Sequence, residues 1–85
     1  MKSFRYTITD EIGIHARPAG LLVKEAGKYE SRIRIKFGEK SVEATGLMAV
    51  MSLGVRGGQT IEIVVEGSDE EKAVAGMKQF LEQNL

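Results

Sequence analysis

The chain has 85 residues, in which twelve lysines and arginines balance twelve acidic residues, and it contains one histidine and no cysteine. This length predicts one domain with a thin core, because a chain of this size buries only about 60% of the surface that it exposes when unfolded. The absence of cysteine excludes disulfides and thiolate metal sites. No apolar run approaches the roughly 20 residues that cross a bilayer, and the first residues lack the apolar stretch of a signal peptide, so we expect a cytoplasmic protein without membrane insertion.

The zero net charge conceals two unlike halves. Residues 1–36 carry eight basic and four acidic side chains, and residues 37–85 carry four basic and eight acidic ones. Net charge therefore argues against a nucleic-acid partner, although the first half is basic on its own.

The first third of the chain predicts a strand and then a helix. Residues 3–8 alternate between polar and apolar side chains, which is the period of a strand with one buried face. From Pro18 to Ala26 the apolar residues recur at helical spacing, and a proline in the first helical turn costs little because the N–H that it lacks has no partner there. Gly27 is expected to end this helix in the left-handed conformation that glycine tolerates.

Two short strands and a short helix are predicted next. Residues 32–37 and 40–44 alternate again, and the Gly-Glu pair between them is typical of a tight hairpin turn. Residues 47–53 are good helix formers followed by Gly54, which predicts about two helical turns.

The last third predicts a strand and a longer helix. Residues 61–66 alternate after a Gly-Gly turn, with glutamates on the polar face. Ser68, followed three residues later by Glu71, has the pattern of a capping box and predicts a helix start. Apolar residues at helical spacing continue to Leu81.

The predicted order of elements is β-α-β-β-α-β-α in a single domain of residues 1–85. Each strand has only one apolar face, so helices are expected to cover one side of the sheet and water the other. The sequence therefore predicts an α+β fold, an open-faced β-sandwich with a four-stranded antiparallel sheet and three helices on one face.

The segment from Gly13 to Pro18 holds the residues that packing explains least. His15, the one histidine, lies where a loop meets the first predicted helix. Free N–H groups and the helix dipole stabilise an anion there by about 0.3 to 1 kcal/mol, and Arg17 can add a guanidinium within reach of the same oxygens. If His15 is the N-cap, Pro18 has no N–H for the imidazole to cap, and the amides of Ala16 and Arg17 stay available.

Two roles for His15 stay open at this point. A helix start disfavours a charged imidazole, which leaves a neutral ring nitrogen able to accept a phosphoryl group covalently. Alternatively, the side chain only caps its helix or bonds to a loop carbonyl. A single histidine with no second ligand at a suitable spacing is not a metal site, so we expect no metal and no cofactor.

Two segments of the chain resemble one known family. Gly13–Ala19 is similar to the active-site segment of HPr, the histidine-containing phosphocarrier protein of the bacterial phosphoenolpyruvate-dependent sugar phosphotransferase system. Met48–Val55 resembles the second helix of that family and the turn after it. The resemblance extends over the whole chain in length and order of elements, and it implies a phosphoryl carrier that is not itself an enzyme.

The resemblance also implies partners and residue roles. Enzyme I, charged by phosphoenolpyruvate, would phosphorylate His15 on Nδ1, and IIA domains of sugar permeases would then accept the group. Arg17 matches the arginine that contacts the phosphoryl group, and Leu47, Met48 and Met51 match the apolar patch that docks partners. Methionines at helical spacing are more often core residues, but a two-turn helix cannot bury all of its apolar side chains. We expect a monomer, because a small shuttle has to present one site to several partners.

The chain departs from the family pattern at Gly46. In carriers with a similar methionine-rich helix this position is a serine that HPr kinase phosphorylates, and glycine has no hydroxyl. Thr45 is expected to be the N-cap of the short helix, with a substitute phosphosite at Thr45 or Ser52 as the lesser alternative. HPr kinase or a catabolite-control regulator stays a candidate partner, without a phosphosite at position 46.

Three other classes of function agree less well with these residues. The main alternative is a regulatory HPr-like binding module that acts on a transcription factor or an enzyme without sugar transport, although relatives of that kind replace the active histidine. RNA-recognition folds of this size place stacking aromatics on the third strand, where residues 40–44 have none, so we expect no nucleic-acid partner. Acyl-phosphate hydrolysis would need a residue that activates water, and none is near His15 in the sequence. The remaining acidic residues are expected on solvated surfaces.

Overall fold

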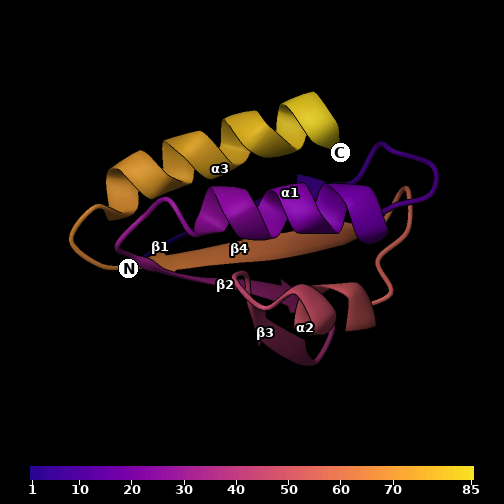
Figure 1. Ribbon diagram of the computed structural model, residues 1–85, viewed down its shortest axis with the longest axis horizontal. Coiled ribbons are helices and arrows are strands. Elements are labelled where there is room, and N and C mark those ends of the chain that lie inside the picture. The colour runs from indigo at the N-terminus through magenta and orange to yellow at the C-terminus, as the bar shows by residue number, and fades with distance from the viewer.

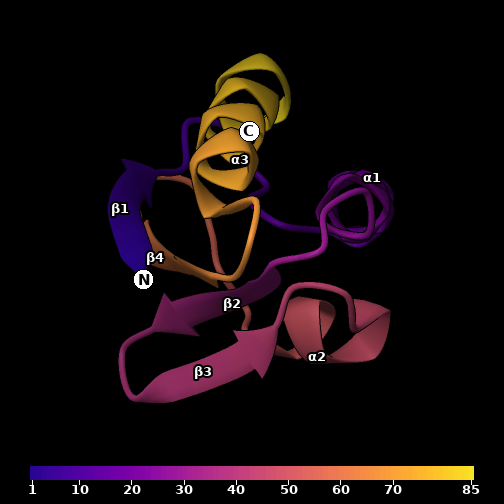
Figure 2. The ribbon, with the colours of Figure 1, turned by 90° about the vertical axis from the view of Figure 1, so that its left-hand side faces the viewer.

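The computed structural model describes residues 1–85 and contains one antiparallel sheet and three helices. The elements are β1 (Lys2–Thr7), α1 (Ala16–Ala26), β2 (Arg32–Phe37), β3 (Lys40–Glu43), α2 (Leu47–Ser52), β4 (Thr60–Glu66) and α3 (Glu70–Asn84). The strand order is β1-β4-β2-β3, so the last strand in sequence lies between β1 and β2. Helices α1 and α3 cover one face of the sheet, with α2 beside β3 (Figures 1 and 2). The predicted open-faced sandwich is confirmed.

The core lies between the sheet and the helices, as the alternation of the strands predicts. Ile61, Ile63 and Val65 of β4 are buried, while Glu66 of the same strand faces water. The three buried residues of β4 belong to a cluster of 19 buried residues, to which α1 and α3 also contribute side chains. The hydrophobic effect therefore selects the side of the sheet on which the helices pack. None of the three helices combines the length and the apolar character needed to cross a bilayer.

The turns follow the sequence prediction except at the end of α1. Gly38 has a positive φ of 60° in the β2–β3 hairpin, and Gly54 has a φ of 68° after α2. Gly27, by contrast, keeps a right-handed φ of −70°, so the left-handed helix end predicted there is wrong. Its N–H donates to the carbonyl of Val23 at 3.0 Å, and that of Lys28 to Glu25 at 3.1 Å. The chain thus leaves α1 through a further right-handed turn.

The start of α3 also differs from the prediction, because the capping box at Ser68 does not form. The N-cap is Asp69, one residue later, and its side chain makes no bond to its own helix. The Ser68 hydroxyl instead donates to the carboxylate of Glu30 at 3.0 Å. Tertiary partners in the loop before β2 therefore replace the local cap.

Asp69 joins α3 to that loop. Its carboxylate accepts the backbone N–H groups of Glu30 at 2.9 Å and Ser31 at 2.8 Å, and it also accepts the Ser31 hydroxyl. The Ser31 hydroxyl and the Glu30 amide lower the pKa of this carboxyl, because they bond to its charged form. The acidic residue thus has a structural partner rather than a role in acid–base chemistry.

Candidate functional site

His15 is the N-cap of α1. Its backbone is extended, with φ −104° and ψ −172°, and its carbonyl accepts the N–H of Ala19 at 2.9 Å. The imidazole makes no hydrogen bond to the helix, so the helix-capping role is wrong. Pro18 is the third residue of the helix and has no N–H to offer, which is the physical reason that the sequence indicated. The ring stays half-exposed and is not used by its own helix.

The first turn of α1 is suited to an anion. It contains no acidic residue, and the N–H groups of Ala16 and Arg17 precede any acceptor within the helix. Arg17 is exposed and takes part in none of the ion pairs of the structure. A phosphoryl group on His15 would therefore meet amide donors and an uncommitted guanidinium at the positive end of the helix dipole.

The loop before His15 is held by a close backbone approach. Gly13 has a φ of 86°, and a Cβ placed on it would lie 2.1 Å from the carbonyl oxygen of Val55. The N–H of Ile14 donates to that same oxygen at 3.0 Å, and the Asp10 carboxylate accepts the N–H of Ile12 at 2.9 Å. Only glycine fits at position 13, so this residue sets where His15 emerges from the loop.

His15 and Arg17 line one open pocket of about 200 Å³. Its other walls are Asp10, Pro18, Leu21 and Asn84. Sequence reasoning missed Asp10, Leu21 and Asn84 as neighbours of the histidine. The end of α3 arrives here because the main-chain oxygen of Leu85 accepts the N–H groups of Thr9 at 2.6 Å and Asp10 at 2.9 Å. Leu21 had a signal in the sequence, since it is an apolar residue outside the buried stripe of its helix.

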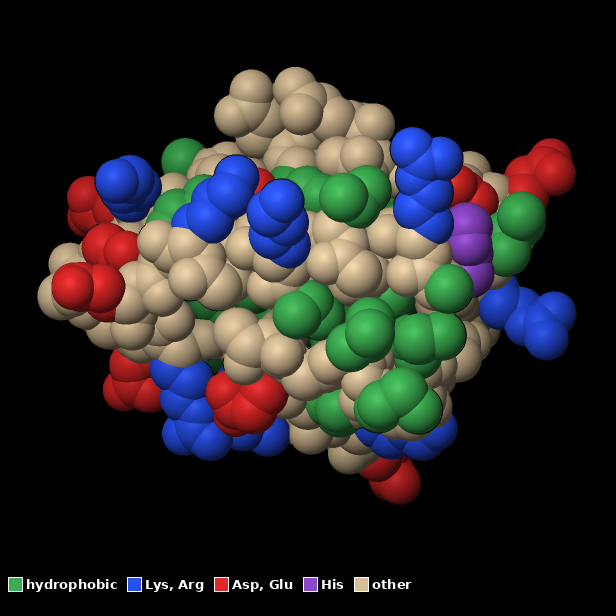
Figure 3. All heavy atoms as spheres, viewed as in Figure 1, with side chains coloured by type: hydrophobic (Ala, Val, Ile, Leu, Met, Phe, Trp, Pro, Cys, Tyr) green, Lys and Arg blue, Asp and Glu red, His purple; other side chains and the backbone are tan.

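The apolar patch, defined as Leu47, Met48 and Met51, is exposed as the short helix predicts. Its side chains are 42%, 77% and 37% exposed, whereas Val50 of the same helix is fully buried. In Figure 3 green hydrophobic side chains extend over the molecular face from the one purple histidine, which lies at the end of the molecule beside blue basic side chains. Helices α1 and α2 also contact one another. The histidine and an accessible apolar surface thus share one side of the fold.

The start of α2 corrects one prediction. The N-cap is Gly46 and no side chain caps the helix, so Thr45 is not the N-cap. Thr45 is exposed and lies one residue too early for its hydroxyl to take that role. Ser52 is exposed, and its hydroxyl donates to the carbonyl of Ala49 at 2.7 Å.

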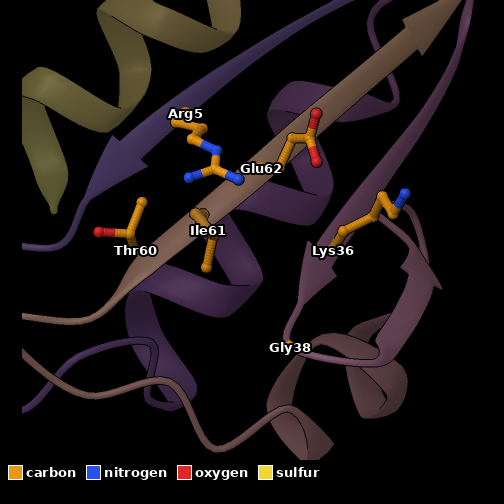
Figure 4. A pocket seen from close by; sticks show the side chains of 6 residues that line it. All are labelled: Arg5, Lys36, Gly38, Thr60, Ile61 and Glu62. Atoms are coloured by element: carbon orange, nitrogen blue, oxygen red, sulfur yellow. The ribbon is translucent and has the colours of Figure 1, made fainter.

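Another hollow lies on the open face of the sheet (Figure 4). It is lined by Arg5, Lys36, Gly38, Thr60, Ile61 and Glu62 and has a volume of about 300 Å³. Arg5, Glu62 and Lys36 are cross-strand neighbours in register on β1, β4 and β2. This row of alternating charge contains no histidine and is carried by the face opposite to the helices.

The other charged residues pair with one another or face water. On the open sheet face, Glu43 of β3 pairs with Arg32 at 2.8 Å and also with Arg34 of β2. The hydrogen bond from Arg32 lowers the pKa of Glu43. The structure brings together no group of three or more histidine or acidic side chains that could hold a metal ion.

Comparison with known proteins defines the class of protein to which this arrangement belongs. The family described as "PTS HPr component phosphorylation site" matches residues 2–83. The chain is 42% identical over 86 residues to the phosphocarrier protein HPr of Mycoplasma genitalium, covering 99% of this chain and 97% of that protein. It therefore belongs to the HPr family, the phosphocarrier proteins of the phosphotransferase system.

Solved structures agree with this assignment. A crystal structure of HPr from Thermoanaerobacter tengcongensis is 38% identical and superposes with a TM-score of 0.94, over 99% of this chain and 94% of that one. Crh of Bacillus subtilis, described as a catabolite repression protein that forms a swapped dimer, is 28% identical with a TM-score of 0.78, over 100% and 98% of the two chains. The fold is thus shared by a phosphocarrier and by a relative connected with catabolite repression.

Proposed function

We propose that this chain carries a phosphoryl group on Nδ1 of His15, accepts it from enzyme I and passes it to IIA domains of sugar permeases. The observation that supports this role is the free imidazole at the N-cap of α1, with Arg17 in the same pocket. In the transfer, the bond between phosphorus and enzyme I breaks as the bond between phosphorus and the ring nitrogen forms. In the second transfer, the bond between phosphorus and the His15 nitrogen breaks as a bond between phosphorus and the IIA domain forms, which restores the free imidazole. The chain therefore acts stoichiometrically and not as an independent enzyme.

Each neighbour of His15 has a separate part in this proposal. The amides of Ala16 and Arg17 and the Arg17 guanidinium hold the phosphoryl oxygens. The charge of the guanidinium and the partial positive charge of the helix start favour the bound anion. An exposed site holds the group firmly enough to carry it and loosely enough to release it. Asp10 and Asn84 border the same pocket as the ring.

The apolar patch of Leu47, Met48 and Met51 is the proposed docking surface. Flexible methionine side chains adapt to partners of different shape, which suits a carrier that meets a donor and several acceptors in turn. We further propose that the protein works as a cytoplasmic monomer, so that the same patch faces each partner in succession.

The experiment is phosphorylation by enzyme I with labelled phosphoenolpyruvate. The wild-type chain should take up one acid-labile phosphoryl group, and His15→Ala should take up none. Because the chain has one histidine, a stable adduct on His15→Ala would refute the proposal. Arg5→Gln, on the open face of the sheet, is the matched control and should be labelled like the wild type.

A regulatory module without sugar transport is the second candidate. The likeness to Crh favours it, since that relative is described in connection with catabolite repression. The two roles separate in one assay, because a purely regulatory chain would bind its partner without transferring the phosphoryl group onward to a IIA domain. Incubation with HPr kinase and ATP would show whether Thr45 or Ser52 takes the place of the serine that is missing at Gly46.

A further inference from the structure

Arg56 lies on the loop between α2 and β4, which two close backbone approaches fix against the loop before His15. A Cβ on Gly13 would lie 2.5 Å from Cα of Arg56, and a Cβ on Gly57 would lie 2.6 Å from the carbonyl oxygen of Asp10. The N–H of Gly58 also donates to the carbonyl of Ile8 at 2.8 Å. The backbone of Arg56 is therefore held against Gly13, which lies two residues before the histidine in the chain.

The side chain of Arg56 is free, unlike several other cations of the chain. Arg32, Arg34 and Lys28 each pair with a glutamate, whereas the side chain of Arg56 takes part in no ion pair and no hydrogen bond. Only its backbone is bonded: the N–H donates to the Gln59 side chain at 2.8 Å, and the carbonyl accepts the N–H of Gln59 at 3.1 Å. Arg56 is also exposed. Its guanidinium is thus available to a group from outside the chain.

The surroundings of Arg56 point to a protein partner and not to the phosphoryl group. Arg17 shares a pocket with His15, but Arg56 lines a separate open hollow of about 430 Å³ that does not include the histidine. The walls of this hollow are Glu11, Ile12, Ile14, Gly54, Val55 and Arg56. Ile12 is 67% exposed at its edge, while Ile14 and Val55 are buried beneath it. In Figure 3 blue basic side chains lie on both sides of the histidine.

We propose that Arg56 is a specificity-determining contact that binds a carboxylate of the phosphoryl donor, enzyme I, next to an apolar side chain of enzyme I seated over Ile12. A guanidinium can bind a carboxylate through two parallel hydrogen bonds, and an apolar rim beside it excludes water from the pair. Glu11 lines the same hollow without pairing with Arg56, so it repels the incoming carboxylate and narrows the choice of partner. This inference rests on the proposed phosphocarrier function.

The test compares Arg56→Gln, Arg56→Lys and the control Arg5→Gln in steady-state phosphorylation by enzyme I, with the carrier concentration varied. Arg56→Gln should raise KM about two- to fivefold, the effect of losing an exposed ion pair, and leave kcat unchanged. Arg56→Lys should raise KM by less than Arg56→Gln, because the positive charge remains, and Arg5→Gln should have the KM of the wild type. The difference between the wild type and Arg56→Gln should shrink as salt is raised, because salt screens exposed charges. Glu11→Gln should change KM in the opposite direction.

The possible outcomes distinguish a failure of the proposed Arg56 contact from a failure of the proposed phosphocarrier function. Equal KM values for Arg56→Gln and Arg5→Gln would overturn the inference while leaving the carrier role intact. A lower kcat at unchanged KM would also overturn it, because Arg56 would then act on the reacting phosphoryl group. If the wild-type chain accepts no phosphoryl group, the proposed function fails and this inference fails with it. Circular dichroism of each variant checks that the fold is unchanged.

Discussion

Replacing Gly13 by alanine should disturb the loop that carries His15 more than the same replacement at Gly38. Both glycines have positive φ, 86° and 60°, so both variants lose about 1 to 2 kcal/mol from the left-handed backbone. At Gly38 the new Cβ meets nothing within 4 Å, whereas at Gly13 it would lie 2.1 Å from the carbonyl oxygen of Val55. That backbone has to move by roughly an ångström, which adds about 1 to 3 kcal/mol, the usual cost of overpacking.

Urea unfolding measures this difference directly. A small domain loses about 1 kcal/mol of unfolding free energy per molar urea, so the midpoint should fall by about 1 to 2 M for Gly38→Ala. The midpoint should fall by about 2 to 5 M for Gly13→Ala, which also has to displace the backbone. Because the hydrogen bond from Ile14 to Val55 holds the same loop, phosphorylation by enzyme I should slow in Gly13→Ala and stay unchanged in Gly38→Ala. Equal midpoints and equal rates in the two variants would refute the argument that backbone contact at Gly13 positions the histidine.

Four further outcomes follow from the site and the fold. Arg17→Gln should slow phosphoryl transfer about ten- to a hundredfold, the effect of losing a hydrogen bond to a charged group, while Arg5→Gln leaves the rate unchanged in the same assay. Met48→Ser should raise KM for enzyme I with a free energy of unfolding within about 0.5 kcal/mol of the wild type, because this side chain is 77% exposed. Met77→Ala, at a fully buried methionine, should instead lose about 2 to 5 kcal/mol of stability. The pKa of Asp69 is lowered in the folded chain, so below about pH 4 the unfolded chain binds more protons than the folded chain does. The contribution of Asp69 to stability is therefore present above about pH 4 and is lost as the pH falls further. Urea midpoints from pH 6 to pH 3 should therefore fall less steeply for Asp69→Asn than for the wild type. Parallel curves for the two proteins would contradict a stabilising role of the ionised Asp69 carboxylate.

The helix starts show how local signals and tertiary contacts compete. At α1 the sequence was sufficient, since Pro18 removes the N–H that an imidazole at His15 would cap, and the structure leaves the ring unbonded to the helix. At α3 the Ser68 signal was overridden, because the loop before β2 offers the Ser68 hydroxyl another partner. A cap is worth about 1 kcal/mol, which one hydrogen bond from a distant segment can match.

The site divides in the same way. Arg17 and His15 are two residues apart, so a helix start brings them together whatever the rest of the chain does. Asn84 and Arg56 lie far from them in sequence and reach the histidine end of the molecule only through the packing of α3 and of the loop before β4. The periodicity of a single sequence does not predict which distant segments come together in this way.

The sequence therefore determined that His15 and Arg17 lie together at a helix start, and it determined where the strands are. These features depend on neighbours within a few residues. Alternation also determined that one face of each strand is buried, since side chains on a strand point to opposite sides in turn. Only the tertiary structure decided the strand order β1-β4-β2-β3, the walls of the pocket at His15 and the free guanidinium of Arg56. These depend on contacts between segments that are distant in the chain, whose energies exceed the local preferences that a sequence displays.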